Sequence, residues 1–270
     1  MIPIGNMLWR IGERLDFDQQ LTWTREAGFD GVGFHASAGV PGKWTGVEPS
    51  ACDTEERVRL RGEIGRLSFS EIHAPFAINL TTDALAEGLA ALKPVLKLAE
   101  DLAVDVVTVH AELPPADGGS GPEVWQVPMQ DLDKAAAEAR TRIVLEIVDG
   151  FDTVMAWDLP NVRINLDVGH MYLPPNRHVL ERYDGIGDLI RHLGSTLAHL
   201  HIHDVSADGD VDHIEAGTGI VDFDGVASAL TDIGYRDSVT LEMNPERVSP
   251  DGIRRSGEHL RSCFRNAGVL

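Results

Sequence analysis

Lysine and cysteine are both in short supply in this sequence. Of its 270 residues, four are lysine and two are cysteine, Cys52 and Cys263. Two cysteines are too few for a disulfide framework, so a reducing cytoplasm is the expected compartment. The sequence also has no apolar N-terminal signal segment and no apolar run long enough to span a bilayer. We therefore expect neither export nor insertion into a membrane.

Positive charge is scarce as well. The chain has 23 Lys and Arg residues against 43 Asp and Glu residues, which gives a formal net charge of -20. Affinity for duplex nucleic acid depends on basic contacts to phosphates, and no cluster of Lys and Arg interrupts the acidic background. A nucleic-acid partner is therefore not expected. The hydrophobic content of 43% is ample for one large α/β core.

Short β-branched or apolar runs alternate with segments of helical periodicity along the whole chain. The eight strand-like runs are residues 1–9, 30–35, 68–73, 104–110, 143–146, 162–167, the start of the 199–219 stretch, and 238–242. Strict alternation predicts a parallel sheet, and eight units in about 250 residues predict a closed (β/α)8 TIM barrel. We expect it to form a single domain, residues 1–270. An open doubly wound sheet is the alternative, but no Gly-rich phosphate fingerprint follows the first run.

The segments between these runs divide into expected helices and two long loops. Helices are expected over residues 17–27, 55–67, 82–102, 132–140, 152–157, part of 179–193, 223–233 and 250–267. Residues 36–53 and 112–128 are rich in Pro and Gly and are expected to be loops that select the substrate. Trp44 and Trp125 in these loops either wall off a pocket or pack over the rim of the barrel.

The stretch HLHIHDVSADGDVDHIEAGTG, residues 199–219, concentrates imidazole groups. His199, His201 and His203 alternate with apolar residues, so they share one face of a strand. An acidic loop then carries His213 and ends at the turn 217–219, whose glycines either serve only the turn or present backbone N–H groups to a phosphate. A single histidine is often a core residue, but this cluster indicates a metal site or a proton-transfer site.

Six consecutive predicted strands end in a side chain that can bind a metal. These side chains are His73, His110, Glu146, Asp167 with His170 three residues on, His201 and Glu242. The C-terminal ends of the strands carry the active site in a TIM barrel. Carboxylates with few imidazoles suit Mn2+, Mg2+ or Co2+, and Zn2+ is favoured as the number of histidine ligands rises.

The motifs LDVGH (residues 166–170) and HIHD (residues 201–204), with GTGIVDFDGVASALTDIGY leading to Glu242, resemble the xylose isomerase-like TIM barrels. That superfamily includes sugar epimerases and isomerases, inosose dehydratases, hydroxypyruvate isomerases and endonuclease IV. The resemblance extends from the second to the eighth predicted strand. Each motif is weak alone, and their order along the strands carries the resemblance without specifying the substrate.

The ketose epimerase branch of this superfamily implies one divalent metal ion. Its ligands would be Glu146, Asp167, His201 and Glu242. His201 is preferred to His203 because it stands three residues before Asp204, as the family's ligand stands before its own acid. Glu146 and Glu242 would then act as base and acid. They would move a proton on carbon next to a carbonyl, through a metal-stabilised enediolate.

The endonuclease IV branch implies a cluster of three zinc ions instead. His73, His110, His170 and His213 match ligand positions of that cluster. That branch has an Asp two residues before the last of these histidines, where this chain has Val211. The mismatch and the acidic charge favour a substrate-contacting role for the four histidines.

These observations predict a metal-dependent isomerase or epimerase of a small sugar or sugar phosphate. A dehydratase of the inosose type, an endonuclease IV-like phosphodiesterase and a non-catalytic sugar-binding barrel are the alternatives.

Overall fold

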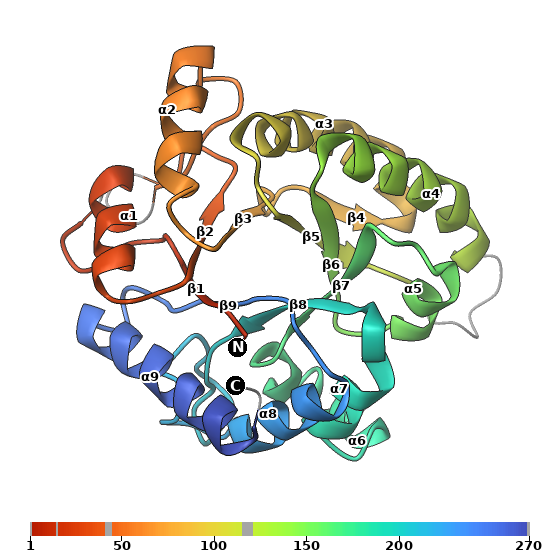
Figure 1. Cartoon of the computed structure of the whole chain (residues 1–270). Helices are drawn as coiled ribbons and strands as arrows, with labels where there is room; N and C mark the ends of the chain where they lie inside the picture. The colour runs from red at the N-terminus through yellow and green to blue at the C-terminus, as the bar shows by residue number, and fades with distance from the viewer. Residues whose placement is uncertain (1, 15, 41–44, 115–120, 269–270) are drawn as a thin grey trace.

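Eight parallel strands close into a barrel, and helices surround it as an outer layer (Figure 1). The structure is a computed structural model that describes residues 2–14, 16–40, 45–114 and 121–268. The barrel strands are β1 (Ile4–Met7), β2 (Gly31–His35), β3 (Phe69–His73), β5 (Val106–Glu112), β6 (Arg142–Glu146), β7 (Val162–Asp167), β8 (Leu197–Ile202) and β9 (Val239–Leu241). β1 pairs with both β2 and β9, and β3 pairs with β5, so the ring is closed. The predicted TIM barrel is confirmed, and the open sheet is excluded.

The outer layer consists of helices that mostly begin and end where the sequence indicates. They are α1 (Phe17–Glu26), α2 (Thr54–Ile64), α3 (Leu85–Leu102), α4 (Gly121–Ala139), α5 (Phe151–Trp157), α6 (Arg177–Arg182), α7 (Ile186–Leu193), α8 (Phe223–Asp232) and α9 (Pro250–Asn266), with the short 3-10 turns η1 (Thr82–Ala84), η2 (His170–Tyr172) and η3 (Gly194–Thr196). Asp16, Asp53, Asp222 and Ser249 each cap a helix, because the side chain accepts a backbone N–H of the first turn.

The strands are buried on both faces, as expected for a parallel sheet covered by helices. All residues of β1, β2, β3 and β8 are buried, and most of them are apolar. Packing is close near the start of β3, where the ring of Phe69 lies against Gly31 of the neighbouring strand. A Cβ atom on Gly31 would lie 2.1 Å from that ring, so glycine is needed there for the two strands to keep their spacing.

Three segments differ from the prediction. A short extra strand, β4 (Asn79–Thr81), pairs with the end of β5 outside the closed ring. The predicted loop 112–128 is wrong over residues 121–128, which form the start of α4 although Pro128 lies inside the helix. The predicted helix within residues 179–193 is divided into α6 and α7, because Asp184 and Gly185 adopt positive φ angles of 56° and 117° between them.

The change at α4 also corrects the interpretation of Trp125. Its side chain is fully buried, stacks near Trp157 and donates a hydrogen bond from Nε1 to Oγ1 of Thr82. A ring that is enclosed in the outer layer cannot wall off a substrate pocket, so that hypothesis is wrong for Trp125. Trp44 lies outside the described residues.

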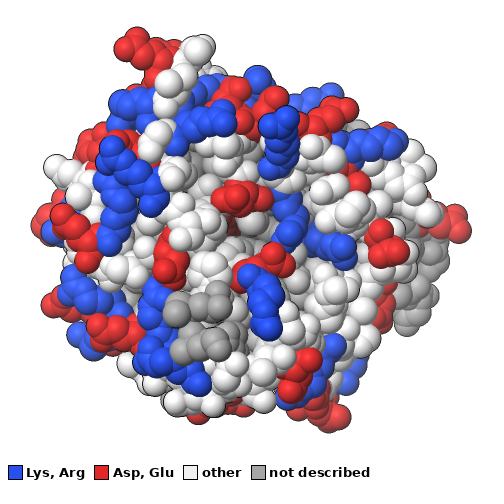
Figure 2. Space-filling model, viewed as in Figure 1, with Lys and Arg blue, Asp and Glu red and all other residues white. Residues whose placement is uncertain are grey.

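Charged side chains of both signs are distributed over the surface of the molecule. On the face shown in Figure 2, acidic and basic side chains are interspersed around the rim rather than separated into broad areas of one sign. Among the helices of the described ranges, none has the length and hydropathy needed to cross a bilayer.

Replacing Gly31 by Ala should lower the free energy of unfolding by about 1–3 kcal/mol, because the new methyl group overpacks the Phe69 ring. Gly62→Ala is the matched control. Gly62 lies inside α2 with no atom within 4 Å of the added Cβ, so this change should stabilise the protein by about 0.5–1 kcal/mol. Urea unfolding measures both changes. A Gly31→Ala protein as stable as the parent would contradict the close contact.

Candidate functional site

The C-terminal ends of the barrel strands bring carboxylates and imidazoles into one buried cluster. Glu146 ends β6, Asp167 ends β7, His201 lies near the end of β8, and Glu242 directly follows β9. These four side chains are between 0% and 8% exposed. Parallel strands of a closed barrel all end at the same rim, so residues that are distant in the sequence become neighbours. The register places Asp167 directly beside His201.

His201 lies at the centre of this cluster with carboxylates on both sides of its ring. Its Nδ1 lies 3.0 Å from Oε2 of Glu146 and 3.0 Å from Oε2 of Glu242. Its Nε2 lies 2.6 Å from Oε1 of Glu71, a fully buried residue of β3. An ionised carboxylate only accepts hydrogen bonds, so Nε2 carries the hydrogen that faces Glu71. A neutral His201 therefore presents the lone pair of Nδ1 to two further carboxylates.

This arrangement requires a positive charge between Nδ1 and the two carboxylates. Among the described atoms, Nδ1 of His201 is buried and has no hydrogen-bond partner. Burial acts to lower the pKa of His201, but the charges of Glu71, Glu242 and Glu146 raise that pKa well above its ordinary value. Burial likewise opposes ionisation of Glu242, yet His201 lowers the pKa of that carboxyl to about 2. The site is therefore built for a proton or a metal cation.

The donor set fits a divalent metal ion. Asp167, His201 and Glu242 offer ligand atoms within 4.8 Å of one another, and Glu146 does so together with His73 and His201. Carboxylate and imidazole donors without thiolates suit hard or borderline divalent ions. The carboxylate of Glu71 behind His201 is also typical of a metal-ligating histidine. The four residues predicted as ligands are thus brought together in one place.

A second group of side chains surrounds Asp167, and it is better described as support for that carboxylate. Nε2 of His203 lies 2.9 Å from Oδ1 of Asp167, and Nδ1 of His170 lies 3.1 Å from Oδ2. Nδ1 of His203 lies 3.0 Å from the backbone nitrogen of His213, which donates to it, and 3.2 Å from the carbonyl oxygen of Asp204. His203 and His170 thus hold Asp167 from two sides, and together with His213 these side chains offer ligand atoms within 4.8 Å of one another.

The four histidines predicted to contact substrate all lie beside this cluster. His73, His110 and His170 surround Glu146, with ring nitrogens 3.6, 3.4 and 3.7 Å from its carboxylate oxygens. His110 and His170 have side chains that are 31% and 25% exposed, so they face the opening. Burial acts to lower the pKa of the His170 imidazole, but the charge of Asp167 raises that pKa to about 10. Contact of these groups with a substrate stays a prediction.

His213 is held in an unusual backbone conformation at the edge of the cluster. Its φ angle is 51°, and its ring stacks on that of His203 with centroids 3.9 Å apart. The neighbouring Asp212 lies 3.2 Å from Nδ1 of His213 but is also paired with Arg247 at 2.7 Å. Val211, where the endonuclease IV branch has an acid, is partly exposed and offers no ligand. Asp212 thus belongs to an ion pair at the surface.

Several residues of the site were missed from the sequence, and most of them are aromatic. Trp9 follows β1 and stacks on His213, with centroids 5.5 Å apart. His35 ends β2, pairs in register with His73 and lies near Phe76. Phe76 is 50% exposed and also contacts the rings of His73 and His110. These rings form a wall on one side of the cluster. The polar end of β2 was a signal for His35, but nothing in the pattern indicated Trp9 or Phe76.

Asp204 explains the turn at residues 217–219 and corrects its interpretation. Oδ2 of Asp204 accepts the backbone N–H groups of Gly217 and Gly219, at 2.9 and 2.8 Å. Oδ1 accepts those of Val205 and Val221, at 2.8 and 3.0 Å. The N–H groups of the two glycines are therefore occupied by a carboxylate of the same chain. The hypothesis that they hold a phosphate is wrong.

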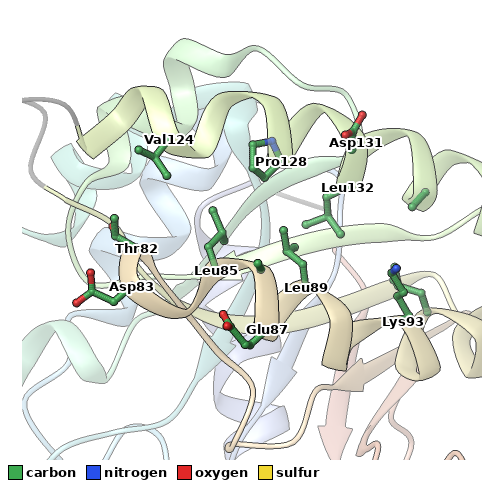
Figure 3. Close-up of a pocket in the computed structure, with 13 residues that line it drawn as sticks. Thr82, Asp83, Leu85, Glu87, Leu89, Lys93, Val124, Pro128, Asp131 and Leu132 are labelled. Atoms are coloured by element: carbon green, nitrogen blue, oxygen red, sulfur yellow. The ribbon is translucent and has the colours of Figure 1, made fainter.

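A separate groove lies in the outer layer between α3 and α4 (Figure 3). It has a volume of about 680 Å³ and is lined by Leu85, Leu89, Val124, Pro128 and Leu132, with Lys93 and a few acidic residues at its edge. It contains no histidine and none of the clustered carboxylates. The chemistry of the cluster at the strand ends makes that cluster, and not the groove, the candidate site.

Comparisons with known proteins agree with this fold. The sequence profile of the xylose isomerase-like TIM barrel family matches residues 21–263. D-psicose 3-epimerase from Ruminiclostridium cellulolyticum is 35% identical over 94 residues, which are 35% of this chain and 27% of that relative. The match thus spans about a quarter of the relative's length.

Solved structures resemble the chain over nearly its whole length. D-psicose 3-epimerase from Clostridium cellulolyticum H10, solved with D-tagatose, gives a TM-score of 0.72 at 19% identity and covers 98% of this chain and 99% of its own. The xylose isomerase domain protein from Planctomyces limnophilus gives 0.75 at 17% identity, covering 100% and 99%. 3-Keto-D-glucoside 4-epimerase from E. coli gives 0.70 at 17% identity, covering 97% and 100%. At these identities the likeness shows the fold alone.

Adding a divalent ion to metal-free protein should raise its thermal stability. At a concentration about 100 times Kd, binding to the folded state contributes about 2.7 kcal/mol, which corresponds to an increase in Tm of about 5–10 °C. Differential scanning fluorimetry with Mn2+, Mg2+, Co2+ and Zn2+, reversed by a chelator, measures this. The Glu146→Gln/Glu242→Gln double variant is the control and should show no increase. Absence of any shift in the parent protein would contradict the metal site.

Replacing Asp204 by Asn should lower the free energy of unfolding by about 2–4 kcal/mol, because one of its oxygens becomes an NH2 group that faces two backbone donors. Asp208→Asn, an exposed change in the same loop, is the control and should leave stability nearly unchanged. Chemical denaturation compares the two variants. Equal stabilities would show that Asp204 does not organise the loop.

Proposed function

The chain belongs to the xylose isomerase-like TIM barrel family, and from this premise we propose that it is a divalent-metal-dependent sugar isomerase or epimerase. The proposed reaction moves a proton on carbon next to a carbonyl. One observation carries the proposal. Nδ1 of His201 is buried at 3.0 Å from the carboxylates of both Glu146 and Glu242, and a cation is needed among them.

Glu146, Asp167, His201 and Glu242 would hold the metal ion. A divalent ion supplies positive charge that stabilises the negative charge developing on a carbonyl oxygen during proton removal. The chain's own groups keep these ligands in place. Nε2 of His203 lies 2.9 Å from Oδ1 of Asp167, and Asn165 donates from Nδ2 to Oε2 of Glu146 at 3.2 Å. Burial of the whole group excludes water and strengthens these electrostatic interactions.

Glu146 and Glu242 are proposed as the pair that takes and returns the proton. They extend from β6 and β9, which are three strands apart in the ring, and both reach His201. Burial opposes ionisation of Glu146, but His201 and the neighbouring histidines hold its pKa well below the ordinary value. An ionised carboxylate of this pair can accept a proton from a substrate bound between them, and once it is protonated it becomes the acid that returns a proton.

The walls of the site fit a small neutral polyol better than a phosphorylated one. His110 and His170 are partly exposed beside the cluster and can bind hydroxyl groups, and the exposed face of Phe76 can pack against C–H groups of a sugar. The backbone N–H groups at Gly217 and Gly219, for which phosphate binding was one of the two roles considered, are occupied by Asp204. We therefore favour a free sugar, in keeping with the psicose epimerase among the relatives.

The same proton abstraction could also be followed by loss of a hydroxide, as in a dehydratase, and the product distinguishes the two reactions.

We keep a reducing cytoplasm as the proposed compartment, since Cys52 and Cys263 are both free thiols. The phosphodiesterase alternative has lost support, because Val211 offers no ligand.

Glu146→Gln and Glu242→Gln should each lower kcat by about 10²–10⁴-fold, because a carboxamide cannot take up or return the proton. The assay follows incorporation of solvent deuterium next to the carbonyl of ketoses such as psicose and tagatose, and identifies an epimer, an aldose or a dehydrated product.

Glu112→Gln is the matched control for these two variants. Glu112 is an exposed glutamate at the end of β5, and its carboxylate contacts Asn79 outside the cluster. This variant should retain full activity. Full activity in Glu242→Gln would contradict the proposed mechanism.

A further inference from the structure

A carboxylate lies at the centre of the barrel where the proposed reaction does not need one. Glu71 is in the middle of β3 and is completely buried. Oε1 accepts the hydroxyl of Thr108 and Nε2–H of His201, both at 2.6 Å. Oε2 accepts Nε2–H of His199 at 3.0 Å. Every polar contact that fixes this carboxylate therefore comes from another buried side chain of the barrel interior.

Stability alone gives little reason to keep a charge at this position. Removing a carboxylate from water is costly, and buried ionic groups are often replaced by apolar residues of similar volume without loss of stability. Barrel interiors are commonly filled by branched apolar side chains. The donors around Glu71 compensate for the burial of its charge, but they do not explain why the charge is there. The contact between Glu71 and His201 explains why a charged residue is kept at this position.

We propose that Glu71 is a positioning residue that makes Nδ1 of His201 the metal-binding atom. The two ring nitrogens of His201 are chemically similar, and either can carry the hydrogen. Because Glu71 accepts at Nε2, the hydrogen is held on that nitrogen, and the lone pair is directed from Nδ1 toward Glu146 and Glu242. This inference rests on the metal site of the proposed function and adds the group that orients its only histidine ligand.

His199 keeps the carboxylate of Glu71 from turning. Because Oε2 of Glu71 can only accept, the hydrogen of a neutral His199 is on Nε2, and Nδ1 accepts from the hydroxyl of Ser238 at 3.2 Å. That hydrogen is directed at Oε2 of Glu71, with Oγ1 of Thr240 at 3.0 Å as a second neighbour. The two carboxylate oxygens are thus assigned to two different histidines, and rotation of the group would break both contacts.

A carboxamide cannot reproduce this pattern. Glutamine has one acceptor oxygen and one donor nitrogen, whereas Glu71 accepts from His199 and His201 at once. In Glu71→Gln one of the two histidines faces an N–H group and must move its hydrogen or its ring, and the negative charge behind His201 is lost. Carboxylates behind a ligating histidine raise its basicity, and their removal typically lowers metal affinity by about 10–100-fold.

The test measures binding of Co2+ and Zn2+ by calorimetry in three purified full-length proteins. Glu71→Gln should bind about 10–100-fold more weakly than the parent protein, with a changed visible spectrum of bound Co2+. Thr240→Val is the matched control, because it removes a buried hydroxyl that touches His199 but not His201 or Glu71. It should bind metal with unchanged affinity.

The tautomer is read directly in the parent protein, so the inference stays testable if Glu71→Gln fails to fold. In the Zn2+-loaded protein labelled with 15N-histidine, His201 should show a hydrogen on Nε2 and coordination through Nδ1. Coordination through Nε2, or equal affinity of Glu71→Gln and the parent, would overturn the role of Glu71 and leave the proposed function standing. Failure of the parent protein to bind either ion would overturn both.

Discussion

The contact of His201 with carboxylates at both ring nitrogens is the constraint on which the rest of the site depends. Glu71 lies behind the ring, and Glu146 and Glu242 lie in front of it, with Asp167 beside them. Four carboxylates within one barrel interior repel one another and are costly to bury. The many imidazoles around them supply hydrogen-bond donors and shared protons, and the site as a whole would be completed by a cation. The histidine-rich character of the strand ends follows from this balance of charge.

The sequence was sufficient for the fold and for the position of the cluster. Alternation of β-branched runs and helices implies a closed parallel barrel, and closure brings the C-terminal ends of all strands to one rim. Glu146, Asp167 and His201 could therefore be placed together before their distances were known. The prediction was less reliable in the outer layer, where α4 begins earlier than its prolines suggest. Burial of Trp125 there depends on contacts between helices that no local pattern reveals.

The remaining features depend on interactions between strands or with the backbone. Glu71 lies two residues before His73 on the same face of β3, which was a usable signal, but a mid-strand position did not suggest a functional group. The position of His203 beside Asp167 follows from the register of β7 and β8 and from backbone contacts with His213 and Asp204. The occupation of two glycine N–H groups by Asp204 is equally invisible in the sequence, because it requires the folded path of the loop.

Asp204 closes a loop of the chain upon itself. Its carboxylate binds the backbone on both sides of the segment between Val205 and Val221. The ends of that segment are consequently anchored to one point beside β8, and the tip around Asp208 is exposed to solvent. Insertions and substitutions at such a tip alter the opening of the barrel without displacing the strand ends. Sequence changes at this tip can therefore reshape the approach to the barrel while the clustered carboxylates keep their positions.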